Sequence, residues 1–315
     1  MDRKEQLVKI FPRNIKEIFL SSSLDFKRLQ EIRLRINRPI IINYNNKEYY
    51  ITKDGQLEKN GDRGYIVSRN EMRETMEFVS SYSLYAYEEE IKQGFITIQG
   101  GHRVGLAGKV VLDGQGIKFI KYISFINIRL SHEKIGCANN VLPFLVGKEG
   151  IKNTLIISPP RAGKTTLLRD IVRQCSNGND VIKGMSVGVV DERSEIGACY
   201  MGEPQNDLGI RTDVLDSCPK AMGIMMLIRT MAPELIAVDE IGTKEDIEAI
   251  SYGSNCGCSI IATIHGNSLE DLEKKPIIKE MIEKKLFSRF VILSGNHSVG
   301  TISHILDEHK NIIYQ

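Results

Sequence analysis

The stretch from residue 154 to residue 169 constrains the fold more than any other part of the chain. It runs from a short apolar segment into a tight loop and then into a helix whose first turn carries Gly163, Lys164 and Thr165. Backbone N–H groups of such a loop, together with the positive end of the helix, bind phosphate groups. We expect Lys164 to reach the β- and γ-phosphates and Thr165 to ligate Mg²⁺. The stretch therefore predicts a site for a nucleoside triphosphate.

The loop matches the pattern G-x-x-x-x-G-K-[ST] at every position except the first, where Ser158 replaces glycine. Glycine adopts a positive φ easily and serine does not, so we expect the first turn to follow a different path. A Gly-Lys-Thr sequence without a ligand is the alternative, but the strand–loop–helix context favours the site of a P-loop NTPase. The residues expected to bind nucleotide are Ser158, Pro159, Pro160, Arg161, Ala162, Gly163, Lys164, Thr165 and Thr166.

The second half of the chain alternates short apolar runs with helical patterns. Candidate buried strands lie at residues 155–157, 187–190, 235–238 and 259–264. Helical stretches separate them. Apolar strands that alternate with helices are typical of a parallel sheet covered on both faces. We therefore expect an α/β fold whose ligands bind at the carboxyl ends of the strands.

Polar residues follow each of these strands. The loop just described follows the first strand, the acidic run of residues 191–195 follows the second, Asp239 and Glu240 the third, and His265 the fourth. Two acids after an apolar run are typical of a Walker B site, in which Asp239 holds Mg²⁺ and Glu240 polarises the attacking water. A histidine at the position of His265 could sense the γ-phosphate or stabilise the charge that develops on it. Each cluster alone has a structural explanation, but four at one end of successive strands favour a RecA-like core.

The first half reads as a smaller, turn-rich α+β domain, and we place the boundary between residues 1–140 and 141–315. Residues 1–150 carry 24 Lys and Arg against 18 Asp and Glu, whereas residues 151–315 carry 18 against 22. Arg33 and Arg35 lie on one face of an alternating strand. A nucleic-acid surface is one interpretation. We favour a solvated strand face, because no aromatic stacking platform accompanies these charges.

Cysteine spacing and apolar content bear on the compartment. The six cysteines show no C-x-x-C metal spacing, which favours reduced thiols in a cytosolic protein. The first residues lack the apolar segment of a signal peptide, and no window approaches the ~20 apolar residues that span a bilayer. We expect a cytoplasmic protein without a membrane span of its own.

The order of the motifs is similar to that of the secretion-superfamily ATPases, which power type II secretion, type IV pili and conjugative type IV secretion. Those enzymes carry a Walker A loop, an acidic Asp box, a Walker B box and a His box; residues 191–195, 230–242 and 263–268 match the last three. A more specific resemblance, to the stage III sporulation protein AA family of endospore-forming bacteria, is carried by residues 31–39, 101–108, 126–130, 158–161 and 190–196. Ser158 in the loop fits that family.

The resemblance implies roles for individual residues. Lys164 and Thr165 would bind the phosphates of ATP and Mg²⁺, Asp239 and Glu240 would serve as the Walker B pair, and His265 would contact the γ-phosphate. The Asp-box carboxylates that position the lytic water or the metal would be Glu192 and Glu195.

The resemblance also implies an assembly. Secretion ATPases work as hexameric rings in which arginines of a neighbouring subunit complete the site, and such an arginine supplies much of the rate. Our candidates are Arg103 and Arg129 at the end of the N-terminal domain, with Arg211 and Arg229 as further ones. An isolated subunit is then expected to hydrolyse ATP slowly.

The function implied is a ring-forming ATPase that moves membrane partners of a sporulation-associated secretion or channel complex. It would be recruited to the membrane by proteins on the mother-cell side and would hold no stable nucleic acid. Two alternatives remain open: a nucleic-acid-dependent RecA-like or RNA-binding ATPase, which the basic first half leaves open, and a structural ring that binds ATP but barely hydrolyses it.

Overall fold

The computed structural model describes residues 3–83, 87–92, 94–114, 116–274, 276–295 and 300–315. Its contacts divide the chain into an N-terminal unit, Met1–His132, and a C-terminal unit, Glu133–Gln315. The sequence places this boundary at residues 140/141. The difference arises because Ala138 and the short helix α5 (Leu142–Leu145) pack into the core of the C-terminal unit. The Ala138 N–H also donates to Asp170 Oδ2 at 2.8 Å.

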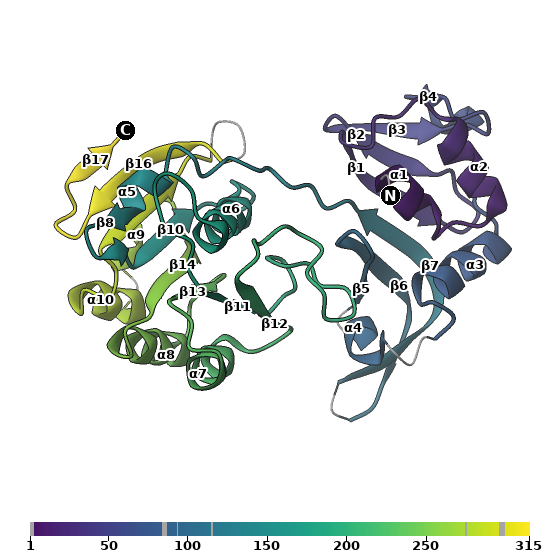
Figure 1. The fold of residues 1–315 in the computed structure, drawn as a ribbon. Helices are drawn as coiled ribbons and strands as arrows, with labels where there is room; N and C mark the ends of the chain where they lie inside the picture. Colours follow the sequence, from purple (N-terminus) through teal and green to yellow (C-terminus); the bar gives the residue numbers. More distant parts are fainter. Residues whose placement is uncertain (1–2, 84–86, 93, 115, 275, 296–299) are drawn as a thin grey trace. The chain divides into compact units, whose positions relative to one another are not determined.

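The N-terminal unit is a seven-stranded sheet of order β4-β3-β2-β1-β7-β6-β5, in which neighbouring strands are antiparallel (Figure 1). Its strands are β1 (Leu29–Arg35), β2 (Ile41–Tyr44), β3 (Lys47–Ile51), β4 (Leu57–Glu58), β5 (Phe95–Ile98), β6 (His102–Leu112) and β7 (Ile117–Arg129). Its helices are α1 (Arg3–Val8), α2 (Arg13–Ser21), α3 (Arg69–Val79), α4 (Glu88–Lys92) and the 3₁₀ turn η1 (Gly61–Arg63). The α+β class predicted for this part is confirmed.

Local chemistry explains these elements. Ile32 and Leu34 of β1 are fully buried, whereas Arg33 and Arg35, which alternate with them, are partly exposed, as the period of two requires. Helix α3 begins with a capping box in which Ser68 and Glu71 satisfy each other's backbone N–H groups. The alternating strand thus buries one apolar face against the core.

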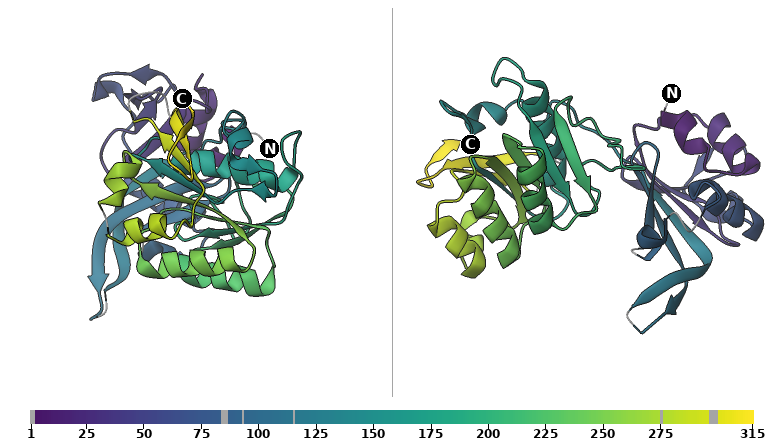
Figure 2. Two further views of the ribbon diagram at one scale, coloured as in Figure 1. Left: turned by 90° about the vertical axis from the view of Figure 1, so that its left-hand side faces the viewer. Right: turned by 60° about the horizontal axis from the view of Figure 1, so that its bottom comes forward.

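The C-terminal unit is an eight-stranded sheet of order β12-β11-β13-β14-β10-β15-β16-β17 (Figures 1 and 2). Its strands are β10 (Thr154–Ser158), β11 (Val187–Asp191), β12 (Thr212–Asp216), β13 (Leu235–Val238), β14 (Ser259–His265), β15 (Arg289–Leu293), β16 (Ile302–Asp307) and β17 (Ile312–Tyr314). Its longer helices are α6 (Lys164–Asn177), α7 (Lys220–Thr230) and α8 (Lys244–Asn255), followed by α9 (Leu269–Glu273) and α10 (Pro276–Glu283). The short strands β8 (Val146–Gly147) and β9 (Gly150–Ile151) form a separate pair.

The first six strands in this order, which end with β15, are parallel to one another. Strands β16 and β17 extend the same side of the sheet with antiparallel pairing. All four predicted strands are present at the expected residues. Two apolar clusters cover the sheet: one joins Ile156 to helix α6, and the other joins Leu155 and Ile157 to α7 and α8. Burial on both faces explains why these strands read as unbroken apolar runs.

Two further observations concern helix length and the cysteines. In the part of the chain that the structure describes, no helix is both long enough and apolar enough to cross a bilayer. The six cysteines are free thiols.

Candidate functional site

The phosphate-binding loop joins the end of β10 to the start of α6. Ser158 is the last residue of β10, so its backbone is extended, and its hydroxyl donates to the Pro159 carbonyl at 2.7 Å. The positive φ angles fall later, at Arg161 (64°) and Gly163 (98°). The expectation that serine would disturb the first turn is therefore wrong, because the first position of this loop does not need the left-handed region.

The start of α6 is suited to an anion. Gly163 is the N-cap residue in the left-handed conformation and gives the helix no side-chain cap. The N–H groups of a first turn without such a cap are available to a phosphate, which the helix dipole also favours. Lys164 and Thr165 follow in the same turn and direct polar groups to the same place.

Asp239, at the end of β13, lies against this turn. Its Oδ1 is 3.1 Å from Lys164 Nζ, and its Oδ2 accepts a hydrogen bond of 2.7 Å from the Thr165 hydroxyl. The Thr263 hydroxyl donates to the same carboxylate. A hydroxyl and a carboxylate side by side fit Mg²⁺, which takes one or two protein oxygens and completes its shell with phosphate and water. Among the described residues, no group of three or more His, Cys, Asp or Glu side chains could hold a metal ion.

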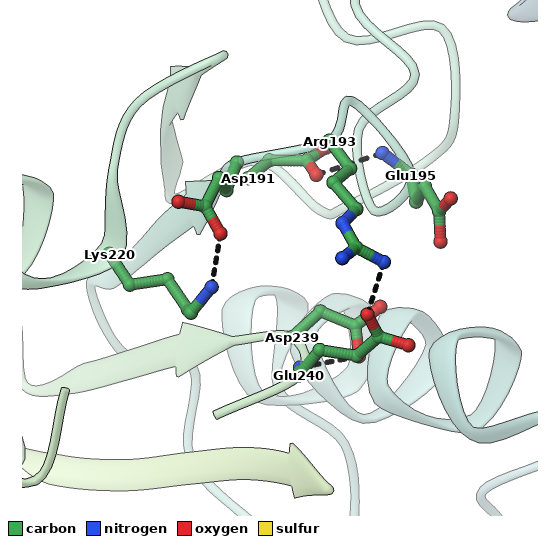
Figure 3. A pocket seen from close by; sticks show the side chains of 7 residues that line it. Asp191, Arg193, Glu195, Lys220, Asp239 and Glu240 are labelled. Carbon is green, nitrogen blue, oxygen red and sulfur yellow. Dashed lines mark hydrogen bonds and ion pairs between the residues drawn. The ribbon is translucent and has the colours of Figure 1, made fainter. Parts of the chain in front are cut away.

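Glu240 is surrounded by positive groups. Its Oε1 is 3.0 Å from Lys164 Nζ and pairs with His265 Nε2. Its Oε2 pairs with Arg193 (Figure 3). Burial is the largest single influence on the pKa of Glu240 and raises it, whereas the hydrogen bond and charge of Lys164 lower it. The charges of Arg193 and His265 act in the same direction, so this pKa lies below its usual range. Glu240 is therefore a carboxylate at neutral pH.

The acidic residues at the end of β11 and just after it have different roles. Asp191 is 1% exposed, and its carboxylate accepts three backbone N–H bonds of 2.8–2.9 Å from the loop that follows, at Glu195, Ile196 and Gly197. Burial raises the pKa of Asp191 to about 6, although the N–H bonds oppose this shift. Asp191 thus holds the loop in shape.

The other acids of this run face outward. Glu192 pairs with Lys220 at the start of α7, and Glu195 lines the same pocket as Asp239 and Glu240 (Figure 3). The loop is also tied to the phosphate-binding helix, because Arg169 of α6 donates to the carbonyls of Glu195 and Ile196 at 2.8 and 2.9 Å. A shift of this loop would therefore be transmitted to α6.

The structure brings together Lys164, Thr165, Asp239, Glu240 and His265 at the carboxyl edge of one sheet, as the strand pattern predicts. Sequence reasoning missed Arg193, Lys220 and Thr263. Arg193 lies within the acidic motif of residues 191–195, and Thr263 lies within the motif of residues 263–268. Their polar side chains in these two motifs were the sequence signal that could have identified them. Lys220 carries no such signal, because the fold alone brings the start of α7 to Glu192.

The candidate arginines come from other elements of the fold. Arg103 and Arg129 are register partners on β6 and β7 of the N-terminal unit, and the Arg103 guanidinium lies 4.2 Å from the centroid of the Phe95 ring. Arg211 precedes β12 and donates to the Ser176 carbonyl at 2.8 Å, and Arg229 is in the last turn of α7. The last two therefore lie toward the amino ends of the parallel strands, away from Lys164.

Comparisons with known proteins show which family this chain resembles. A family model described as "Sporulation stage III, protein AA" matches residues 1–313. Stage III sporulation protein AA of Bacillus subtilis (strain 168) is 44% identical over 285 residues, which cover 90% of this chain and 89% of that protein.

Solved structures resemble the chain in fold. The ATPase DotB of Yersinia pseudotuberculosis has a TM-score of 0.59 at 14% identity, covering 95% of this chain and 80% of that one. The pilus retraction motor PilT with bound ADP has a TM-score of 0.57 at 12% identity, covering 91% and 77%. The predicted fold class, a RecA-like P-loop core preceded by a smaller α+β domain, is confirmed.

Proposed function

The chain belongs to the sporulation stage III, protein AA family, and from this premise we propose that it is a Mg²⁺-dependent ATPase that hydrolyses the β–γ phosphoanhydride bond. One observation carries the proposal: Lys164, Thr165, Asp239, Glu240 and His265 come from three strand ends and converge on the uncapped first turn of α6.

The binding step uses the residues of the loop. The N–H groups around Gly163 and the Lys164 ammonium would take the β- and γ-phosphates, which replace the carboxylates now paired with Lys164. Thr165 and Asp239 would hold Mg²⁺, which neutralises the charge that develops on the phosphates.

The hydrolytic step would use Glu240. Because its pKa is low, Glu240 is a weak base, and its role is to orient the attacking water rather than to remove the proton early. Phosphoryl transfer has a loose transition state that depends mostly on positioning, so a weak base suffices. Arg193 and His265 hold Glu240 from the solvent side, and His265 lies beside Ser158 in the β10–β14 register, within reach of the terminal phosphate.

The sharpest test is Glu240→Gln. Glutamine keeps the size of the side chain but cannot accept the proton that the attacking water releases later in the step, so we expect steady-state ATP hydrolysis to fall ~100-fold or more while ATP still binds. Glu248→Gln, on the exposed side of α8, is the matched control and is expected to keep the parent rate. Lys164→Ala should abolish nucleotide binding itself. Equal hydrolysis by the parent and Glu240→Gln would favour the alternative of a structural ring that binds ATP but barely hydrolyses it.

Finer parts of the proposal concern assembly. We propose a hexameric ring in which Arg103 or Arg129 of one subunit approaches the nucleotide of the next, with Arg211 and Arg229 as further candidates. The ring would be recruited on the mother-cell side by membrane proteins of a sporulation channel complex and would couple hydrolysis to their movement. The fold shared with a pilus retraction motor supports a mechanical role.

The proposed ring can be tested through the concentration dependence of ATP hydrolysis. Hydrolysis per subunit is expected to rise steeply with protein concentration, because one subunit completes the site of another. Stimulation by single-stranded nucleic acid at ~0.15 M salt would instead favour the nucleic-acid-dependent alternative. Both are measured in the same ATPase assay.

A further inference from the structure

The strands β6 and β7 extend beyond their neighbours in the N-terminal unit. Strand β1 pairs with β7 only from Arg129 to Phe125, and β5 pairs with β6 only up to Gly105. Beyond these points, within the described residues, β6 and β7 pair only with each other, and they project from the sheet (Figures 1 and 2). We call this two-stranded part, residues 109–112 and 117–121, the ribbon.

One face of the ribbon is apolar. The register places Val110 opposite Ile120 and, beyond a register shift, Leu112 opposite Ile117, so Val110, Leu112 and Ile120 share a face and Ile117 lies beside Leu112 at the tip. Leu112 is 71% exposed, and Val110 and Ile117 are also exposed. A contiguous apolar face on a projecting element indicates an interaction surface.

The ribbon is also basic. Residues 109–121 contain Lys109, Lys118 and Lys121 and a single acid, Asp113. Lys109 and Lys121 are direct register partners on the opposite face, which they share with Val111 and Phe119, and like charges opposite each other destabilise an antiparallel pair. An anionic surface would relieve that repulsion, so the charge pattern indicates an anionic partner.

We propose that the ribbon docks on the surface of an anionic lipid bilayer, with the apolar side chains near its tip toward the acyl chains and with Lys109 and Lys121, farther from the tip, at the level of the headgroups. An interfacial element needs an apolar face and flanking Lys or Arg, and the ribbon has both. The outer edges of a two-stranded ribbon carry unpaired backbone N–H and C=O groups, which the hydrated headgroup region satisfies and the hydrocarbon does not. The docking is therefore shallow. It does not depend on ATP hydrolysis.

The chain contains no tryptophan, so a single introduced one reports on the ribbon alone. In full-length Leu112→Trp, the emission is expected to shift to the blue with vesicles of phosphatidylcholine and phosphatidylglycerol, and not with phosphatidylcholine alone. The protein should sediment with the same vesicles at ~0.15 M salt and be released at high salt.

Charge and apolar variants separate the two contributions. Lys109→Gln/Lys121→Gln is expected to weaken partitioning into anionic vesicles roughly 30-fold, since each lysine near an anionic surface contributes about fivefold. Lys47→Gln, an exposed lysine of the β2–β3 hairpin, is the matched control and should bind like the parent. Leu112→Ser/Ile117→Ser should also lose binding. Thermal unfolding of each variant verifies that it is folded.

Three results would overturn the proposal. The first is sedimentation without a change in tryptophan emission, which would place the lipid contact on another surface. The second is unchanged binding by the double lysine variant. The third is a blue shift with polyglutamate but not with vesicles, which would assign the ribbon to an acidic protein partner.

Discussion

Replacing the buried Asp191 by asparagine should remove a pH-dependent part of the stability. The folded pKa of Asp191 is about 6 against an ordinary 3.8, because burial penalises the carboxylate. A carboxyl with a raised folded pKa contributes stability that is fully present below pH 3.8 and is lost as the pH rises through 6. The asparagine side chain cannot ionise, so this loss is expected to disappear in Asp191→Asn.

The shift sets the size of the effect. About 2 pKa units correspond to about 3 kcal/mol over the whole window and to about 2 kcal/mol between pH ~4.5 and ~7. The variant also loses a hydrogen bond, because an amide NH₂ would face either the Glu195 N–H or the N–H groups of Ile196 and Gly197. That cost does not depend on pH, so it moves the whole curve without changing its slope.

The assay is urea unfolding of the parent and of Asp191→Asn at a series of pH values. The unfolding free energy of the variant minus that of the parent should increase by about 2 kcal/mol from pH ~4.5 to ~7. Asp213→Asn, an exposed carboxyl on the neighbouring strand β12, is the control, and its difference should stay constant. A difference that is also constant for Asp191→Asn would refute the reasoning that burial governs this carboxyl.

Two further predictions concern the backbone. In Gly223→Ala a methyl group on α7 would lie 2.4 Å from Val190 Cγ1, so we expect a loss of about 1–3 kcal/mol in unfolding free energy, whereas Gly242→Ala, with nothing within 4 Å, should cost far less. An equal effect of the two substitutions in urea unfolding would contradict the packing argument. Arg161→Gly should raise the unfolding free energy or leave it unchanged, because Arg161 has a positive φ of 64° and glycine avoids the strain of this conformation, which is about 1 kcal/mol. A fall in thermal stability would show that the Arg161 side chain holds the loop.

Much of the fold could be predicted because it rests on short-range patterns. The strands β10, β11, β13 and β14 were predictable because strands buried on both faces read as apolar runs. Strand β12 was not, since its sequence Thr-Asp-Val-Leu-Asp is polar and half-exposed at a sheet edge. The strands β15 to β17 follow the last motif of the chain, and nothing local indicates that β15 pairs with β10.

The candidate site was also predictable in part: the positions of its residues were predictable, but the role of each acid was not. Carboxyl ends of parallel strands meet at one edge, so His265 and Asp239 were expected near Lys164 from the strand pattern alone. The task of each acid was not predictable from the run itself. Asp191 was one of several acids in sequence, and only burial and three backbone donors show that it organises the loop.

By itself, the sequence determined the kind of protein this is: a phosphate-binding loop on a parallel sheet, with acids and an imidazole at the matching strand ends. Such features depend on residue type and period, which are local properties of the chain. Only the tertiary structure decided which positive groups hold Glu240, why Ser158 is tolerated, and that an apolar ribbon projects from the N-terminal unit. Those features depend on contacts between residues far apart along the chain, on backbone angles and on solvent exposure, which no window of sequence contains.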